Sequence, residues 1–489
     1  MYILIKKEDH DMKKMMKCLS DKRDLVLWSV IVCIGFVYFF LLGERGYYMT
    51  PDSNSYIFQS YEREPFYPVV IQLCKMICGE RYFLYAVVLL QAITAFGACL
   101  FAARKLQRYM RLNRMELLMC FLLLLFPFGL DSMWSQPRVN FAHMIMTDCF
   151  SYAFFYFFTG EMLSYLQDGK KSAYLWMAAI VSVMVINRNQ MAILYVNIAF
   201  LTVVLNCFWS KKKEWGRCLR ELALIVTAFI LTMVLTLGYC YVKWGYFSKS
   251  SENSFTFVTN LLYAADAEDA ELFEDEEAGA VFTQLYDQID EAGWTYRYAG
   301  EGALAASDYM IACHDPIKSR ILRPFFQDYV SQLGMEPMSF ESDRIKKAVM
   351  EEIKQVLLKE HFGDWLFHAL GMMPRGLIYS VIPVIVPGTY PAAAAAALAV
   401  WIAFFAGLVY LLLSKKTAGQ ARVLPVFAVS IAGFMIMNVA ALSLVIFVMY
   451  RYLNYTQGLF WIVFYLIFRE IYRDRIRGKK DYILSHTKG

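Results

Sequence analysis

Long apolar stretches recur along the whole chain and alternate with short polar segments. A helix that crosses a bilayer needs about 20 mainly apolar residues. Ten stretches come close to this length, so the pattern predicts an all-α integral membrane protein with about 10 transmembrane helices. The predicted spans are residues 25 to 43, 82 to 103, 115 to 134, 144 to 166, 172 to 187, 190 to 209, 221 to 242, 390 to 413, 423 to 449 and 455 to 471.

Positive charge gathers in every second connecting segment. Lys and Arg concentrate in the cytoplasmic loops of membrane proteins, so these segments and both termini are expected in the cytoplasm. The aromatic-rich first loop and one long insert then face the outside of the cell membrane. The basic segments are the N-terminal head, residues 104 to 114, 168 to 171, 210 to 220 and 414 to 422, and the C-terminal tail.

The same pattern divides the chain into consecutive parts. A basic cytoplasmic head (1–24) precedes a transmembrane module (25–242), which holds spans 1 to 7 and the first outer loop (44–81). Apolar residues in the insert recur at helical spacing, so it is expected to be mainly helical. The remaining parts are this extracytoplasmic loop domain (243–389), spans 8 to 10 (390–471) and a basic cytoplasmic tail (472–489).

Acidic residues in the loop domain allow two interpretations. A run of acids forms either a solvated helix face or a calcium site, although it lacks the spacing of a known calcium loop. Asp364 and His368 share one predicted helical face and could hold a metal, but no third ligand is in register. The sequence demands no metal cofactor, and a divalent metal is compatible with it. The acids in the run are Asp266, Asp269, Glu274 and Asp275.

Composition narrows the class of protein. The chain is 58% hydrophobic and only 19% charged, which is too apolar for a soluble protein of 489 residues. Its net charge of +5 lies in short blocks between apolar runs, which argues against nucleic acid as a partner and for membrane lipids. The 11 cysteines are scattered, mostly inside apolar runs, and indicate neither a disulfide framework nor a zinc site.

Four arginines at outward ends of predicted spans are the main candidates for chemistry. A guanidinium binds two oxygens of a phosphate and stays charged at any working pH. Each arginine could instead anchor a helix end, but positive charge is normally depleted on this side of the membrane. The sequence therefore predicts an anionic headgroup site. The arginines are Arg63, Arg138, Arg188 and Arg451.

Asp52, in the first outer loop, is the candidate general base. It follows Pro51 among dense aromatics, including Tyr48 and Tyr67. A carboxylate at an interface could take a proton from an incoming hydroxyl, and Asp52 could equally cap a short helix. Asp148, inside predicted span four, is costly there unless paired and is therefore a functional candidate. The nearby His143 is either a supporting residue or a structural histidine.

At this point the sequence resembles the GT-C class of polytopic glycosyltransferases, which includes protein mannosyltransferases and bacterial aminoarabinose transferases. Asp52 of TPDSNSY matches the acid of the first outer loop in that class, and REPFYP resembles a segment found a dozen residues later. Thr147–Asp148 resembles a Thr-acid step at span four, and Arg451–Tyr452 resembles an Arg-Tyr step before the last span.

The resemblance implies an inverting glycosyltransferase with an extracytoplasmic active site. The donor would be a monosaccharide linked to polyprenyl phosphate, and the acceptor a cell-envelope glycan, lipid or protein. Asp52 would be the base, the four arginines would bind the donor phosphate, and Asp148, His143, Tyr48 and Tyr67 would support them. Two alternatives stay open: a transporter or flippase of envelope precursors, and a polysaccharide polymerase or ligase that uses Arg320, Arg323 and His314 of the insert.

Overall fold

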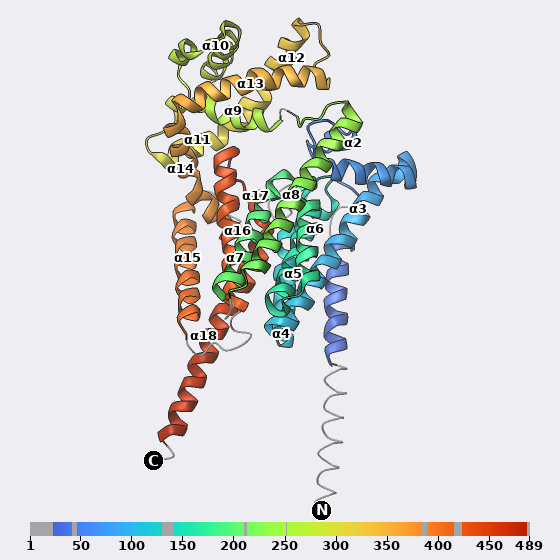
Figure 1. The fold of residues 1–489 in the computed structure, drawn as a ribbon, viewed down its shortest axis with the longest axis vertical. Coiled ribbons are helices and arrows are strands. Elements are labelled where there is room, and N and C mark those ends of the chain that lie inside the picture. The colour runs from blue at the N-terminus through green and yellow to red at the C-terminus, as the bar shows by residue number, and fades with distance from the viewer. Residues whose placement is uncertain are drawn as a thin grey trace, which may run out of the picture.

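A bundle of long helices carries a separate group of shorter helices at one end (Figure 1). The computed structural model describes residues 23–41, 46–129, 140–209, 213–250, 252–382, 389–414 and 423–486. Regular structure in these ranges is helical, and the one β-type pairing found there is an isolated bridge between Tyr48 and Met144. The predicted all-α membrane fold is confirmed.

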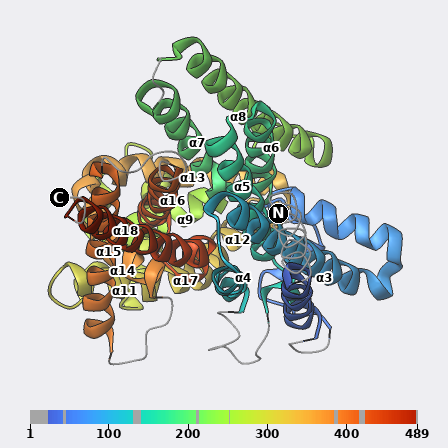
Figure 2. The same ribbon diagram turned by 90° about the horizontal axis from the view of Figure 1, so that it is seen from below.

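The bundle consists of the N-terminal helix and the long helices that follow it. Seen from below, α5 lies near the centre, with α3 on one side and α15, α16 and α18 on the other (Figure 2). The bundle helices are Arg23–Leu41, α3 (Phe66–Met110), α4 (Arg114–Gly129), α5 (Asp148–Asp168), α6 (Lys171–Asn187), η4 (Asn189–Ala192), α7 (Ile193–Val203), η5 (Val204–Trp209), α8 (Trp215–Trp244), α15 (Tyr390–Leu413), α16 (Val423–Val445), α17 (Tyr450–Leu453), η10 (Asn454–Thr456) and α18 (Gln457–His486).

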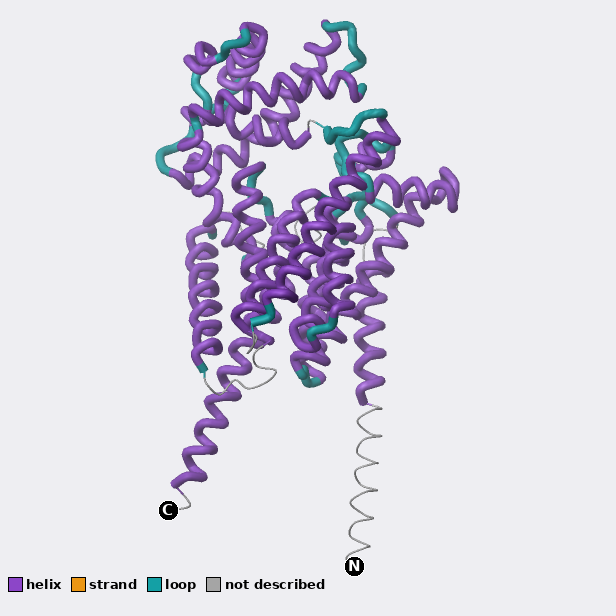
Figure 3. Tube along the Cα trace, in the orientation of Figure 1, coloured by secondary structure: helices purple, strands orange, loops and turns teal. Residues whose placement is uncertain are grey.

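The insert between α8 and α15 forms the second group. Loops gather mainly at this end of the molecule, while the described turns at the other end are short (Figure 3). Its helices are α9 (Glu252–Ala264), η6 (Ala267–Leu272), α10 (Glu276–Glu291), η7 (Tyr296–Tyr298), α11 (Ala303–Pro316), η8 (Ile317–Leu322), α12 (Arg323–Gln332), α13 (Phe340–Glu360) and α14 (Phe362–Val381). The first outer loop contributes the short α2 (Ser53–Ile57), and η3 (Phe141–His143) precedes α5.

Six helices of the described chain are long and apolar enough to cross a membrane. They are Arg23–Leu41, Phe66–Met110, Asn189–Phe208, Trp215–Trp244, Tyr390–Leu413 and Val423–Val445. The other predicted spans also fall on helices, namely α4, α5, α6 and α18. The protein is therefore a membrane protein, whereas the count of ten spans and the assignment of domains stay predictions.

Helix α3 is longer than its predicted span because it continues through a kink. Gly79 has φ 70° and ψ 170°, a backbone conformation that suits glycine and breaks the helix direction. The segment before the kink leaves the bundle sideways in Figure 1. Met76 and Ile77 on this segment are 80% and 81% exposed. The segment before the kink therefore carries apolar side chains outside the packed bundle.

Three clusters of buried apolar side chains hold the described part of the molecule together. The largest cluster fills the bundle. Gly160 lets α5 pack closely against α3, since a Cβ at this position would collide with Phe101. The second cluster fills the insert and also includes Val439 and Leu442 from α16. Apolar burial therefore ties the insert to the bundle through α16. The third cluster packs Tyr56 and Tyr67 of the first outer loop against Ile145 and Phe150. A hydrogen bond from Lys243 of α8 to Gln59 also joins this loop to the bundle.

Candidate active site

A polar cavity of about 230 Å³ lies where the first outer loop, the ends of the bundle helices and the insert meet. We call it the arginine cavity. Its lining includes four residues proposed from the sequence as catalytic or phosphate-binding, together with Asp148. The lining residues are Asp52, Tyr56, Glu62, Arg63, Glu64, Met146, Thr147, Asp148, Asn187, Arg188, Asn189, Gln190, Glu252, Arg451 and Tyr452.

Asp52 and Arg63 form an ion pair on one wall of the cavity. Arg63 Nη2 lies 2.6 Å from Asp52 Oδ1, and Arg63 Nε donates to Ser55 Oγ at 2.6 Å. The Arg63 guanidinium also lies over the ring of Tyr56, 4.6 Å from its centroid. Asp52 occupies the N-cap position of α2, as the capping alternative expected, but its side chain makes no capping hydrogen bond. The carboxylate is held by Arg63 instead.

The environment of Asp52 keeps its carboxyl group ionised. Burial, the largest single effect, raises the pKa of Asp52, whereas the charge and hydrogen bond of Arg63 lower it. Arg451 and Arg188 add weaker attraction, and the pKa of Asp52 ends below its ordinary value. All three arginines therefore act electrostatically on this one carboxylate.

Asp148 also lines the arginine cavity. It is the first residue of α5, where the helix dipole favours negative charge, and not an interior residue of a span as the sequence predicted. The helix starts later than expected because η3 and the bridge from Met144 to Tyr48 occupy the preceding residues. Arg188 Nη1 lies 2.7 Å from Asp148 Oδ1, and Arg451 Nε lies 3.9 Å from the same oxygen.

Neighbouring polar groups fix the two arginines that face Asp148. Both guanidinium groups lie over the ring of Tyr452, at 4.8 Å from its centroid for Arg188 and 5.2 Å for Arg451. The backbone carbonyl of Arg451 accepts a hydrogen bond from the Tyr152 hydroxyl at 2.9 Å. Asn187 Nδ2 donates to the carbonyl of Thr147 at 3.1 Å, which ties the end of α6 to the start of α5.

The remaining carboxylates of the cavity have cations of their own. Glu252 accepts from Arg323 Nη2 at 2.9 and 3.0 Å and lies 2.6 Å from Lys318. Glu62 lies 3.6 Å from Arg323. Glu64 lies 3.4 Å from Lys249. The pairs of Glu62 with Arg323 and of Glu64 with Lys249 join the first outer loop to the insert.

Arg451 has the longest ion-pair contact of the three cavity arginines described, 3.9 Å against 2.6 Å for Arg63 and 2.7 Å for Arg188. Arg188 and Arg451 both lie within 4 Å of Asp148 Oδ1, and the short contact of 2.7 Å goes to Arg188. The buried Nε of Arg451 has no hydrogen-bond partner in the described structure. A buried donor without a partner is costly, so the cavity can accept an anion at this point.

Other residues singled out from the sequence do not line the arginine cavity. Tyr67 is fully buried and donates to Gln91 Oε1 at 2.7 Å, and its ring packs edge-on against Tyr56. Tyr48 contributes its backbone to the bridge with Met144. The ring nitrogens of His143 contact the carbonyls of Phe39 and Gly46, at 2.9 and 3.1 Å. Arg138 lies outside the described residues.

The insert residues behind the polymerase alternative do not converge. His314 is buried, and its ring nitrogens lie 3.3 Å from Asp315 Oδ1 and from the carbonyl of Thr256. Arg320 is exposed, whereas Arg323 is committed to Glu252. A constellation of these three side chains is therefore absent from the described structure.

The acids considered as metal ligands serve local structure. Asp266 and Asp269 form a capping box at η6, and Asp275 caps α10 by accepting from Glu277 N and Ala278 N. Asp364 contacts His361 Nδ1 at 3.3 Å, while the ring of His368 packs against Tyr263. No group of three or more His, Cys, Asp or Glu side chains in the described part of the chain is placed to hold a metal ion.

Sequence reasoning missed the acids Glu62, Glu64 and Glu252 as parts of the site, and it missed Lys318 and Lys249, which pair with two of them. The signal for Glu62 and Glu64 was their position on either side of Arg63 in a loop close to the bilayer. No local signal marks Glu252, because it reaches the cavity only through the packing of the insert on the first outer loop.

Helical architecture and the charged cavity define an all-α membrane protein with a polar site at one end of its bundle. No known protein family matches the chain, and no curated protein matches it significantly. Two solved structures share 14% identity with it, both of ArnT from Cupriavidus metallidurans. The one bound to undecaprenyl phosphate has a TM-score of 0.34 over 86% of this chain and 78% of that chain. The apo structure has a TM-score of 0.31 over 86% and 77%.

These matches belong to the class that the sequence resembles. At such identity and TM-score they carry no conclusion about activity. The function proposed below depends on the side chains of the arginine cavity.

Proposed function

We propose that the protein is a glycosyltransferase that moves a monosaccharide from a polyprenyl-phosphate donor to an extracytoplasmic acceptor, with inversion at the anomeric carbon. The observation that carries the proposal is the convergence of Arg63, Arg188 and Arg451 with Asp52 and Asp148 in one cavity. Guanidinium groups in a poorly solvated site stabilise the charge that develops on a leaving phosphate. The cavity lies at the end of the apolar bundle, where a lipid headgroup can reach it.

The reaction is a single displacement. The acceptor hydroxyl oxygen attacks the anomeric carbon, the bond from that carbon to the phosphate oxygen breaks, and its electron pair leaves with the polyprenyl phosphate. The acceptor proton passes to the Asp52 carboxylate. Because the pKa of Asp52 is held low by Arg63, attraction of Arg63 towards the developing phosphate charge would make Asp52 a stronger base. Neither step calls for a cofactor.

Arg451 is expected to bind the phosphate most directly, since its ion-pair contact is the longest of the three, and Arg188 and Arg63 complete the site. Arg138 stays a proposed phosphate ligand as well. A secondary transporter is less well supported, because the charged residues cluster at one end of the bundle and not at its middle.

Binding of undecaprenyl phosphate to the purified protein tests the donor site. Arg451→Ala is expected to weaken binding roughly 10- to 100-fold, the equivalent of one lost charge-assisted hydrogen bond of about 1.5 to 3 kcal/mol. Arg451→Lys should fall between this variant and the wild type, because it keeps the charge and loses the fork. Arg320→Ala is the matched control, an exposed arginine that lines no part of the cavity. Equal affinity of the Arg451 and Arg320 alanine variants would refute the assignment.

Transfer of label from a panel of radiolabelled polyprenyl-phosphate sugars to a membrane extract tests the reaction. Asp52→Asn should bind the lipid phosphate and lower transfer by about 10² to 10⁴-fold, the usual range for loss of a general base. Turnover of this variant within a few-fold of the wild type would exclude Asp52 as the base. Failure of the wild-type protein to release any label would refute the proposed function itself.

A further inference from the structure

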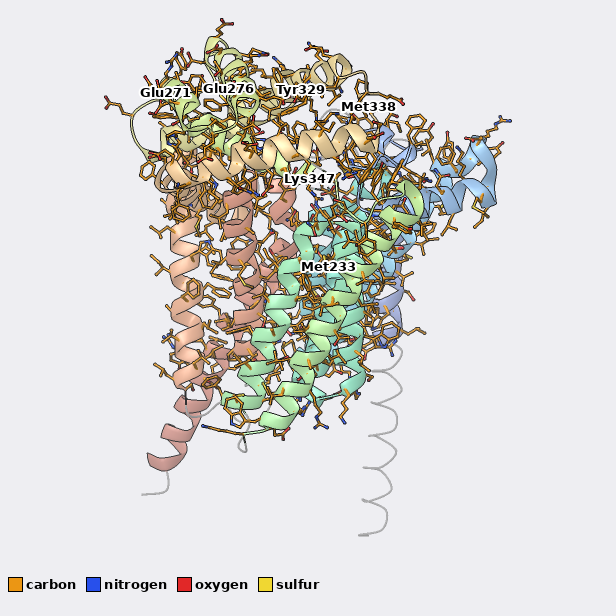
Figure 4. The ribbon with its side chains drawn as sticks, turned by 45° about the horizontal axis from the view of Figure 1, so that its top comes forward. Met233, Glu271, Glu276, Tyr329, Met338 and Lys347 are labelled. Carbon is orange, nitrogen blue, oxygen red and sulfur yellow. The ribbon has the colours of Figure 1, made fainter. Side chains whose placement is uncertain are left out.

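A second cavity of about 370 Å³ adjoins the arginine cavity on the side of the insert. Its volume lies in the range of about 300 to 1,000 Å³ that is usual for small-molecule sites. One side belongs to the first outer loop and the other to α9, α12, α13 and the loop between the last two. The lining residues are Pro51, Asn54, Ser55, Phe58, Ser60, Tyr61, Glu62, Phe255, Arg323, Gln327, Met338 and Lys346. Met338 marks the insert side in Figure 4.

The two cavities share a wall. Glu62 is the one residue of the described chain that lines both. The wall is completed by the hydrogen bond from Arg63, on the arginine side, to Ser55, on the other. Arg323 of the second cavity likewise reaches across to Glu252 of the first. A molecule in the second cavity would therefore meet, at Glu62, a molecule bound by the arginines.

The lining of the second cavity suits a neutral ring that carries hydroxyl groups. Phe58 is 77% exposed and Gln327 is also exposed, so an aromatic face and an amide are both available to a ligand. The positive charges already have partners, because Arg323 pairs with Glu252 and Lys346 is attracted by the carboxylates of Asp343 and Glu62. Lys346 Nζ also donates to the carbonyl of Pro337 at 2.6 Å. With the Glu62 carboxylate at its inner end, the cavity offers an anion little attraction.

We propose that the second cavity binds the acceptor, a neutral hydroxyl-bearing molecule such as a sugar, and that Glu62 positions the acceptor hydroxyl towards the donor. The proposal rests on the glycosyltransferase function proposed above and adds to it the class of acceptor and its route of approach. Phe58 packs against the ring, while Gln327 and Glu62 hydrogen-bond to its hydroxyl groups. The acceptor enters between the first outer loop and the insert, apart from the donor lipid.

Selective blockage of the second cavity tests the proposal. Phe58→Cys is made in a background in which the exposed Cys33 and Cys78 are replaced, and it is coupled to a bulky maleimide. Labelling is expected to lower sugar transfer to a membrane extract at least ten-fold and to leave binding of undecaprenyl phosphate within two-fold. The matched control is labelled Tyr47→Cys, an exposed aromatic position of the same loop that lines neither cavity.

Each outcome of the blocking experiment decides a different point. Equal transfer by the two labelled proteins would overturn the acceptor cavity and leave the donor site untouched. Loss of undecaprenyl phosphate binding on labelling at Phe58 would also overturn it, because the two cavities would then be one site. A wild-type protein that transfers no sugar would instead refute the glycosyltransferase function.

Transfer kinetics of two variants, measured without maleimide labelling, distinguish binding of the acceptor from positioning of its hydroxyl group. Gln327→Ala should raise the extract concentration needed for half-maximal transfer about ten-fold with little change in the maximal rate. Glu62→Gln should lower the maximal rate as well, because the amide keeps one accepting oxygen but loses the charge and the second accepting oxygen of the carboxylate. Gln332→Ala, at the end of the same helix, is the control for Gln327. No change in the acceptor dependence of either variant would contradict the proposal.

Discussion

At the scale of single residues, Glu62 and Asp52 differ sharply in how they hold a proton. Burial, followed by the charge of Glu252, raises the pKa of Glu62, whereas the pKa of Asp52 is lowered. Acidification from neutral pH therefore protonates Glu62 first. The charged groups that face Glu62 come from several elements and are Glu252, Arg323, Arg63, Lys318 and Lys346.

This difference predicts an acid limb in the transfer reaction. As the pH falls through the raised pKa of Glu62, one oxygen of its carboxyl group becomes protonated and the group loses its charge. Glu62 then accepts a hydrogen bond from the acceptor less well. The acceptor concentration needed for half-maximal transfer should therefore rise. Glu62→Gln should flatten this limb. Profiles of transfer against pH for both proteins measure it, and an unchanged limb in the variant would assign the titration to another group.

Protonation of Glu62 does not unfold the protein, so unfolding caused by this group cannot explain a loss of transfer at acid pH. A raised pKa means that the folded protein binds the proton more tightly than the unfolded chain. This group therefore favours folding as the pH falls through that range and disfavours it as the pH rises. A melting temperature that stays level while transfer declines on acidification would separate the two effects.

The cavity residues could be predicted from their positions near the ends of apolar spans more than from any sequence motif. Asp52, Arg63, Arg188 and Arg451 were chosen because charge near the outward ends of apolar spans is unusual, and all four line one cavity. Their pairing could not be predicted. Arg63 lies against Asp52, eleven positions away, whereas Arg188 meets Asp148 across two helices. Such contacts depend on tertiary packing, which local spacing does not encode.

At the scale of elements, α5 carries Asp148 into the cavity and packs closely against α3 at Gly160. Gly160→Val should force Phe101 out of place, because even a Cβ collides with that ring. Overpacking of a tight core typically costs about 1 to 3 kcal/mol. The variant should melt at a lower temperature in detergent and bind undecaprenyl phosphate more weakly, since α5 would move with its N-terminal carboxylate.

Gly97→Val on α3 is the control for this substitution. A Cβ at Gly97 meets nothing within 4 Å. As in Gly160→Val, a helical glycine is lost and a β-branched residue is gained. Equal melting temperatures for the two variants would show that the α3–α5 contact does not limit stability.

Helix existence was predictable and helix ends were not. Apolar length is a strong signal, and every predicted span falls on a helix, with 390 to 413 matching α15 residue for residue. The start of α5 was wrong by four residues because the chain before it pairs with Tyr48 of a distant loop: the carbonyl of His143 accepts from Tyr48 N, and Ile145 N donates to the carbonyl of Tyr48. Predicted span 82 to 103 is likewise only part of the kinked α3.

At the scale of the whole molecule, the insert and the first outer loop close over the same end of the bundle. The described chain places the start of the N-terminal helix and the end of α18 at the other end (Figure 1). The insert core shares Val439 and Leu442 with α16, and the Glu252–Arg323–Glu62 contacts join it to the loop. Sequence could place both segments on one side of the membrane, but the contacts between them required the structure.

Orientation in the membrane is the last prediction, since both proposals need the cavities outside the cell. The insert holds one cysteine, Cys313, and it is buried, so an exposed position must supply the thiol. Glu271, an exposed residue of the insert labelled in Figure 4, is suitable as Glu271→Cys in the background without Cys33 and Cys78. A membrane-impermeant maleimide should label it in intact cells.

Lys170→Cys is the counterpart at the opposite end of the bundle. It precedes α6, whose other end carries Asn187 and Arg188 into the cavity, and a helix of 17 residues separates the two by roughly 25 Å. Because Lys170 belongs to a basic loop, the positive-inside rule places it in the cytoplasm. It should therefore react only after lysis. Labelling of Lys170→Cys in intact cells, with Glu271→Cys protected until lysis, would put the arginine cavity on the cytoplasmic side and exclude an extracytoplasmic acceptor.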